Sequence, residues 1–406
     1  MVSEQRCRAC GQATPAGAAF CNHCGARLGP AAGRPPIPRY LLVLGAGLFF
    51  GLCGLCTLVE FLVSVPHPLV LAIAAPLPIL PAAFYTLLVI GVDRYEREPL
   101  GALAATFLWG ALVAVALAWL INTMLSALAG AALGPAAGRV LAAAFGGPVV
   151  EETAKGLVLL LLFWLYRREF DDLLDGIVYG SLCGIGFAMT ENVLYFSRSL
   201  LQGGVGGLAL VFVLRDLLGG LSGHPAYTAT TGIGLGLARE SRSPAVQLLA
   251  PVAGWTLAVV QHAFWNGVVA TLLPRLIGPW TLLVMLVYPL PLLTAFGVTI
   301  FLLLRREGRI LRTYLRDEVA SGVVTAEEYA RLGSLGGRLK AEWTALSQRG
   351  LAAWRAMVQL HDAATELAFR KWQSARGVPI SDAAAAEAVC KRRIAEARTA
   401  LRAHGL

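Results

Sequence analysis

The chain has 406 residues, of which 57% are hydrophobic and 15% are charged, and its formal net charge is +9. This composition is too apolar for a soluble globular protein of that length. The positive charge does not indicate nucleic-acid binding, because most basic residues flank apolar segments or lie within residues 305–406. We therefore expect an all-α polytopic membrane protein that is embedded in the lipid bilayer and has no nucleic-acid partner.

The N-terminal 29 residues contain two C-x2-C pairs that are separated by ten residues, and a glycine follows the second cysteine of each pair. The four cysteines are Cys7, Cys10, Cys21 and Cys24. Four thiolates at this spacing suit tetrahedral coordination of zinc, and the glycines permit tight turns. A cytoplasmic location disfavours disulfides between them. The sequence thus predicts a structural zinc ribbon over 1–29 and a Pro-rich linker over 30–39.

Apolar stretches dominate residues 40–304, and each is long enough for the roughly 20 residues that a membrane-crossing helix needs. We count eight of them: 40–65, 69–92, 100–128, 140–166, 173–197, 208–238, 246–272 and 279–304. Arginines follow or precede these stretches mainly on alternate sides. By the positive-inside bias, both termini are expected in the cytoplasm of a cell-membrane protein.

The fourth stretch contains three ionisable residues, Glu151, Glu152 and Lys155, in the sequence "GPVVEETAKGLVLLLL". A charge at bilayer depth costs about 2.5–3.5 kcal/mol, so such residues usually face a protein interior and have a function. On a helix the two glutamates point about 100° apart, and Lys155 is close enough to pair with either. One glutamate is then held by Lys155 and the other is free for chemistry. A structural salt bridge between helices is the alternative.

The next three stretches add polar residues at similar depth. Glu191 lies in "GFAMTENVLYF", His224 in "LSGHPAYTATTGIG", and His262 and Asn266 share a helix face in "VVQHAFWNGVV". From the helical rise, Glu151, Glu191 and His262 lie about 9–16 Å below the outer surface. These side chains are expected to share one pocket in the outer half of the bilayer.

Residues 305–406 turn to Ala, Arg and Glu at helical spacing. Thr325 and Glu328 form the capping-box pattern at a helix start in "TAEEYARL". We expect a cytoplasmic helical tail with a break at "RGVPISD" before its last helix, and we assign no chemistry to it.

The motifs "EETAK", "FAMTEN", the histidine of the sixth stretch and "QHAFWN", in this order, resemble those of the PrsW family of intramembrane proteases. The turn "DRYEREP" after the second stretch also resembles that family, and the resemblance covers residues 40–304. Related CAAX prenyl endopeptidases and bacteriocin-processing proteins share the paired glutamates and an H-x-x-x-Asn/Asp motif, which His262 and Asn266 match. Glu191 replaces the F-x-x-x-H histidine of the CAAX pattern, which favours PrsW. The resemblance implies an intramembrane endopeptidase acting on single-pass membrane proteins, such as anti-sigma factors.

Two mechanisms fit these residues. In the metal-free mechanism, Glu151 or Glu152 is the general base, tuned by burial and by Lys155. The residues that orient the water and stabilise the oxyanion are then His224, His262 and Asn266.

In the metal mechanism, Glu191, His224, His262 and one of the paired glutamates bind the metal, and the other glutamate is the base. The sequence has no local H-E-x-x-H motif. It therefore leaves a catalytic metal open, as well as the choice between the two glutamates.

A non-enzymatic transporter or receptor is the contrasting hypothesis, with the same charges forming a proton relay or a ligand site. Inverted repeats of the apolar pattern would support transport, and none is visible in the sequence.

Overall fold

The computed structural model describes residues 4–6, 12–15, 39–167, 169–376 and 383–405, and the chain divides into two units, Met1–Leu52 and Cys53–Leu406. The first unit contains an antiparallel hairpin, in which β1 (Glu4–Arg6) pairs with β2 (Ala13–Pro15). The four cysteines of the predicted zinc ribbon lie outside the described residues.

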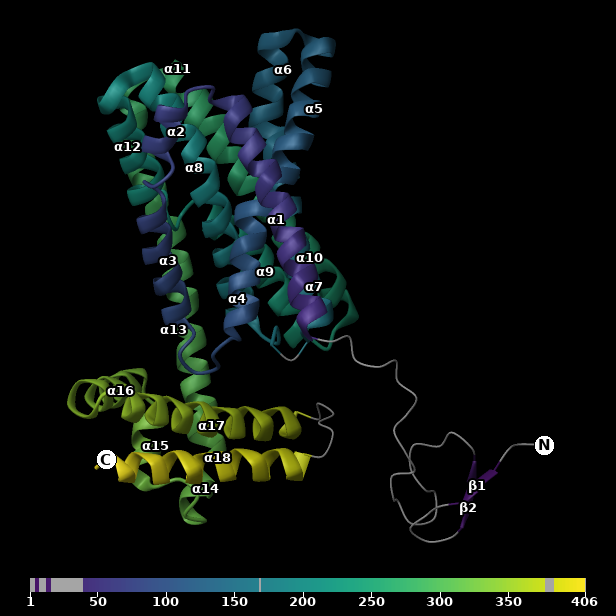
Figure 1. Ribbon diagram of the computed structural model, residues 1–406, viewed down its shortest axis with the longest axis vertical. Helices are drawn as coiled ribbons and strands as arrows, with labels where there is room; N and C mark the ends of the chain where they lie inside the picture. Colours follow the sequence, from purple (N-terminus) through teal and green to yellow (C-terminus); the bar gives the residue numbers. More distant parts are fainter. Residues whose placement is uncertain (1–3, 7–11, 16–38, 168, 377–382, 406) are drawn as a thin grey trace. The chain divides into compact units, whose positions relative to one another are not determined.

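Helices make up the apolar region (Figure 1). Many of them continue into one another through short π-helical segments. The elements are α1 (Arg39–Ser64), α2 (Pro68–Ala74), α3 (Ile79–Val92), α4 (Leu100–Leu108), η1 (Trp109–Ala114), α5 (Val115–Leu133), α6 (Pro135–Leu141), η2 (Ala142–Gly146), α7 (Gly147–Leu165), α8 (Leu173–Phe212), η3 (Val213–Leu218), α9 (His224–Glu240), α10 (Pro244–Ala263), η4 (Phe264–Leu272), α11 (Leu273–Ile277), the 3-10 turn η5 (Gly278–Trp280), α12 (Thr281–Val287) and α13 (Pro289–Tyr314).

Five stretches of the described residues are long and apolar enough to cross a membrane. They are Leu44–Ser64, Pro68–Val92, Leu100–Leu133, Leu173–Leu218 and Pro244–Tyr314. Helix α7 carries its three ionisable residues, and α9 has only 17 residues, so neither is among the five. The predicted helical membrane protein is confirmed, and the number of eight spans stays a prediction.

The sixth apolar stretch differs in its boundaries from the expected 208–238. Its first residues belong to the end of α8 and to η3, and α9 begins only at His224. Pro225 explains this start, because proline is favoured in the first turn of a helix, where its missing N–H is not needed. As a result, His224 stands at the N-terminus of a helix instead of within one.

Helices α8 and α9 approach each other closely through small residues. A Cβ on Gly184 would lie 2.4 Å from the carbonyl oxygen of His224, and a Cβ on Gly176 would lie 2.2 Å from that of Gly232. Such contacts are possible only for glycine, and small residues drive helix packing in membranes in this way. The glycines of α8 therefore fix the position of His224.

The C-terminal region consists of α14 (Arg316–Ala320), α15 (Ala326–Leu332), α16 (Leu335–Arg349), α17 (Leu351–Ala375) and α18 (Ala383–Ala403). The predicted capping box is confirmed: Glu328 N–H donates to Thr325 Oγ1 at 3.1 Å, and Thr325 N–H donates to Glu328 Oε2 at 2.8 Å. Helices α17 and α18 lie on the two sides of the predicted break, and they cross the end of α13 (Figure 1).

The turn between α3 and α4, residues 93–99, connects the apolar helices to the C-terminal helices. Arg97 donates to both carboxylate oxygens of Glu342 at 3.0 Å, and Tyr95 is buried in the core around α17. On the other side, Tyr179 of α8 donates to Glu98 at 2.5 Å. The motif "DRYEREP" thus has a clear structural role at this junction.

A buried histidine in the same junction predicts acid sensitivity. His361 is 1% exposed and bonds Glu342 Oε1 through Nδ1 at 2.9 Å, and burial lowers the pKa of His361. As the pH drops, the histidine of the unfolded state therefore binds a proton at a higher pH than His361 of the folded state does. The free energy of unfolding then falls as the pH drops through about 6.5, the ordinary pKa of histidine. Hydrogen exchange in α16 and α17 should therefore speed up between about pH 7 and pH 5. The variant His361→Gln should weaken this pH dependence, whereas the exposed-site control His404→Gln should keep it; an unchanged profile in His361→Gln would contradict the expectation.

Candidate functional site

Glu152 on α7 is fully buried, and three groups share its carboxylate. Lys155 Nζ lies 2.6 Å and His262 Nδ1 3.0 Å from Oε1, while Thr228 Oγ1 donates to Oε2 at 3.1 Å. Both Lys155 and Glu152 have side chains with no exposed surface. Every oxygen of Glu152 is therefore occupied within the protein.

Glu151 has the opposite surroundings. Asn122 Nδ2 donates to Oε1 at 3.3 Å, but Oε2 is buried without a hydrogen-bond partner. His262 Nε2 lies 3.8 Å from Oε2. Of the two glutamates that the sequence left equivalent, Glu152 is the one held by Lys155, and Glu151 is the one with an available oxygen.

His262 is held in one tautomer by these partners. A carboxylate only accepts hydrogen bonds, so His262 Nδ1 donates to Glu152, and Nε2 carries the lone pair. Asn266, one turn later, places its Nδ2 3.3 Å from Nε2 and also donates to the Ala143 carbonyl at 3.2 Å. The lone pair of Nε2 is therefore directed toward the region of Asn266 and Glu151.

His224 lies between a cation and an anion. Lys155 Nζ is 2.9 Å from Nδ1, and Glu191 Oε2 is 2.9 Å from Nε2. An ammonium group only donates, so Nδ1 accepts from Lys155 and Nε2 donates to Glu191. The imidazole rings of His224 and His262 are 4.9 Å apart and nearly perpendicular. Lys155 thus connects Glu152 to His224 and, through His224, to Glu191, whereas His262 bonds Glu152 directly.

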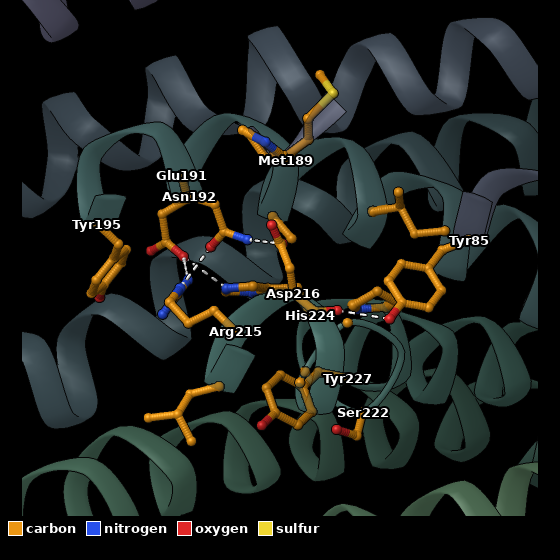
Figure 2. Close-up of a pocket in the computed structure, with 18 of the residues that line it drawn as sticks. Tyr85, Met189, Glu191, Asn192, Tyr195, Arg215, Asp216, Ser222, His224 and Tyr227 are labelled. Carbon is orange, nitrogen blue, oxygen red and sulfur yellow. Dashed lines mark hydrogen bonds and ion pairs between the residues drawn. The ribbon is translucent and has the colours of Figure 1, made fainter. Parts of the chain in front are cut away.

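A second polar network, not identified from the sequence, extends from Glu191 (Figure 2). Arg215 pairs with Glu191 and donates from Nε to Asn192 Oδ1 at 2.6 Å. Asn192 Nδ2 donates to Asp216 Oδ1 at 2.5 Å, and Tyr85 donates to the Asp216 carbonyl at 2.7 Å. The charged pair Arg215–Asp216 in an apolar stretch was the available signal, because buried ionisable residues in membranes have partners.

A cavity of about 60 Å³ opens between these residues. Glu191, Arg215, His224, His262 and Asn266 all contribute to its wall. A volume of about 10–15 Å³ suffices for one water, so the cavity has room for several. Of the seven residues predicted for the membrane site, four line the cavity, and the other three, Glu151, Glu152 and Lys155, contact its histidines or one another.

Three of these residues suit a metal ion. Among the described residues, Glu151, His224 and His262 form a group whose ligand atoms all lie within 4.8 Å of one another. Two imidazoles and a carboxylate are a donor set that zinc favours, and Glu151 Oε2 has no other partner. Glu152 behind His262 matches the carboxylate–histidine arrangement that orients metal ligands. Glu191, expected as a ligand, instead pairs with Arg215 and His224, and His224 has to exchange one of its hydrogen bonds to bind a metal.

The fold and site together define a helical membrane protein with a buried glutamate–histidine centre. Residues 98–295 match the model of the PrsW family intramembrane metalloprotease. This segment includes all seven predicted membrane-site residues.

Curated proteins named Protease PrsW are also similar to the chain. The chain is 34% identical to Protease PrsW of Geobacillus kaustophilus (strain HTA426) over 36% of its own length and 58% of the relative. It is 34% identical to Protease PrsW of Clostridioides difficile (strain 630) over 40% of its length, and 28% identical to that of Bacillus subtilis (strain 168) over 38%; each match covers 63% of the relative. The chain thus matches less than two thirds of each relative. No solved structure is significantly similar to it.

The buried pair Lys155–Glu152 makes a testable contribution to stability. Glu152→Leu leaves a buried ammonium without its carboxylate, which costs about 3–5 kcal/mol. Glu151→Leu removes a carboxylate with one hydrogen bond and should cost far less. Adding Lys155→Met to Glu152→Leu should recover part of the loss, because the uncompensated charge disappears. Thermal unfolding of the detergent-solubilised variants measures this, and an equal loss of Tm in Glu151→Leu and Glu152→Leu would refute the assignment.

Proposed function

We propose that this chain is an intramembrane endopeptidase that hydrolyses peptide bonds of membrane-embedded or single-pass membrane proteins. The observation that carries the proposal is the buried, unpaired oxygen of Glu151 beside the lone pair of His262. The match of residues 98–295 to the PrsW family model and the similarity of the chain to proteins named Protease PrsW support it. Anti-sigma factors are the substrate class that the sequence resemblance suggests.

In the metal-free mechanism, Glu151 is the general base. Its free oxygen takes a proton from the attacking water while the water oxygen bonds to the scissile carbonyl carbon, and the proton passes to the leaving amine. The products are a carboxylate and an amine. Asn266 Nδ2 is a neutral donor at the same place and suits stabilisation of the oxyanion.

Glu151, His224 and His262 are also the residues that would hold a catalytic metal. When bound there, a divalent metal supplies Lewis-acid polarisation of the carbonyl and activates water at neutral pH. Glu152 holds the tautomer of His262, and Glu191 with Lys155 holds the orientation of His224. With Glu151 as a ligand, these supporting residues keep the same functions.

The remaining organisation follows the sequence. We assign residues 1–29 to a zinc ribbon, 30–39 to a linker, 40–304 to the protease region and 305–406 to a helical tail. Eight spans with both termini in the cytoplasm agree with the alternating arginines and with the sequence of helices from α1 to α13. The membrane is that of the cell.

Substitutions in the centre should abolish cleavage without unfolding the protein. Glu151→Gln keeps the shape and removes the base, so the rate should fall by about two orders of magnitude or more. His262→Ala should be comparably severe, and a double variant should lose little more, because the residues act as a unit. The assay is cleavage of a single-pass membrane substrate by purified protein. Thr123→Val is the control, since the exposed Thr123 hydroxyl donates to the Trp119 carbonyl of its own helix; full activity in Glu151→Gln would disprove the role of this carboxylate.

Metal content distinguishes the metal mechanism from the metal-free mechanism. The purified chain should bind one zinc ion in the ribbon and, in the metal mechanism, a second one at the buried centre. Cys10→Ser with Cys24→Ser should remove one ion and leave the cleavage rate unchanged, whereas His262→Ala should remove the other together with activity. Elemental analysis of the proteins provides the stoichiometry. Full activity with no metal at the centre would establish the metal-free mechanism instead.

A further inference from the structure

Three large apolar side chains are exposed along one side of helix α16. Leu339 is 39%, Trp343 is 69% and Leu346 is 37% exposed. They lie four and three residues apart, so they share one face of the helix. We call them the α16 stripe. Single exposed apolar residues are normal on a protein surface, but a continuous row of them indicates contact with an apolar partner.

The other sides of α16 have a different character. Ala341 and Ala345 are buried in a core that α16 shares with α17 and α18. Beyond the stripe, Lys340, Ser347 and Gln348 form an exposed polar side. Helix α16 therefore has a packed face, an exposed apolar face and an exposed polar face. Helices that lie at a membrane surface divide their exposed sides in this way.

Two contacts hold α16 against the turn between α3 and α4. Glu342 accepts from Arg97 at 3.0 Å, and the guanidinium of Arg338 lies 5.0 Å from the centre of the Tyr95 ring. Both α3 and α4 belong to stretches that can cross a membrane, so the turn between them lies at a bilayer boundary. The headgroup layer is about 5–8 Å thick on each side of the bilayer. A helix bonded directly to this turn therefore lies at the level of the headgroups.

The α16 stripe lies on the side of the helix that is directed toward this turn. Leu339 precedes Glu342 by three residues and Leu346 follows it by four, so both are neighbours of Glu342 on the helix surface. Trp343 is adjacent to them. The contact between Glu342 and Arg97 thus orients the stripe toward the bilayer boundary.

The size and charge of this region favour lipid over a second copy of the chain. A stable protein interface uses about 20–30 residues on each side, whereas the stripe consists of three. Residues 305–406 contain 18 lysines and arginines against 11 aspartates and glutamates. Such a region is attracted to anionic lipid headgroups, and it is repelled by a second region of the same charge.

We propose that the α16 stripe lies in the lipid headgroup layer beside the turn between α3 and α4, and that Trp343 anchors the C-terminal helices to the bilayer. Tryptophan is enriched at this depth, because its ring is apolar and its indole N–H can bond to headgroups or water. The proposal requires only that the chain is embedded in a membrane, and it does not depend on the peptidase function.

Photocrosslinking of the full-length protein identifies what covers the stripe. The protein is reconstituted in nanodiscs of phosphatidylcholine and phosphatidylglycerol, with a photoreactive residue at position 343 or, as the matched control, at position 348 on the exposed polar side. Position 343 should crosslink to lipid, and position 348 should not. Crosslinking of position 343 to protein, or equal lipid yields at the two positions, would overturn the proposal.

Hydrogen exchange measures the anchoring itself. Trp343→Asp removes an exposed side chain and leaves the packed face of α16 intact, so the fold should be retained. In the same nanodiscs, amide exchange of α16 should speed up roughly tenfold, because the helix loses its burial in the headgroup layer. Leu346→Asp should act in the same direction.

Gln348→Asp is the control for this measurement, since it adds the same charge on the exposed polar side and should leave the exchange unchanged. Equal acceleration in Trp343→Asp and Gln348→Asp, or no acceleration in Trp343→Asp, would show that the stripe does not anchor the C-terminal helices.

Discussion

The ion pair between Lys155 and Glu152 determines where the other polar groups of the site can lie. Both side chains are fully buried, and an ammonium group in that environment needs a carboxylate at short distance. Because Lys155 also donates to His224, the pair decides which nitrogen of His224 accepts and which donates. In the same way, Glu152 determines which nitrogen of His262 donates and which carries the lone pair. Two histidines from different helices thus receive defined tautomers from one buried charge pair.

The pair also explains why two adjacent glutamates are not redundant. Glu152 is needed to neutralise Lys155 and to orient His262, and it has no oxygen left for a substrate. Glu151, rotated by about 100° on the same helix, keeps an oxygen without a partner. Because neighbouring residues of an α-helix point in different directions, two identical side chains have different roles here. Glu152 is structural, and Glu151 is available for chemistry.

Much of this arrangement could be predicted from the sequence, because ionisable residues are rare in apolar helices and their few positions are conspicuous. Glu151, Glu152, Lys155, Glu191 and the two histidines were all identified in this way, and the structure brings them together in one cluster of hydrogen bonds and ion pairs. The choice between the glutamates could not be predicted, because it depends on Asn122 and Thr228, which come from other helices.

The contacts of Arg215 could not be predicted from the sequence for a related reason. Its partners Glu191 and Asn192 come from α8, and η3 brings it back toward that helix before α9 begins at His224. The composition of the sequence gives a continuous apolar stretch over this region and does not show where the helix is interrupted.

Helix α13 runs without interruption from Pro289 to Tyr314, across the point at residue 304 where the composition changes from apolar to charged. The C-terminal helices are attached there, and they also enclose Tyr95 and pair Glu342 with Arg97. A chain cut at residue 304 would divide a helix, expose an aromatic side chain and leave an arginine without its carboxylate. The C-terminal helices are therefore not a separable module. A truncation or domain exchange at residue 304, where the hydropathy changes, would damage the packing of both the apolar helices and the C-terminal helices. Division of this protein into functional parts has to follow its packing instead of its composition.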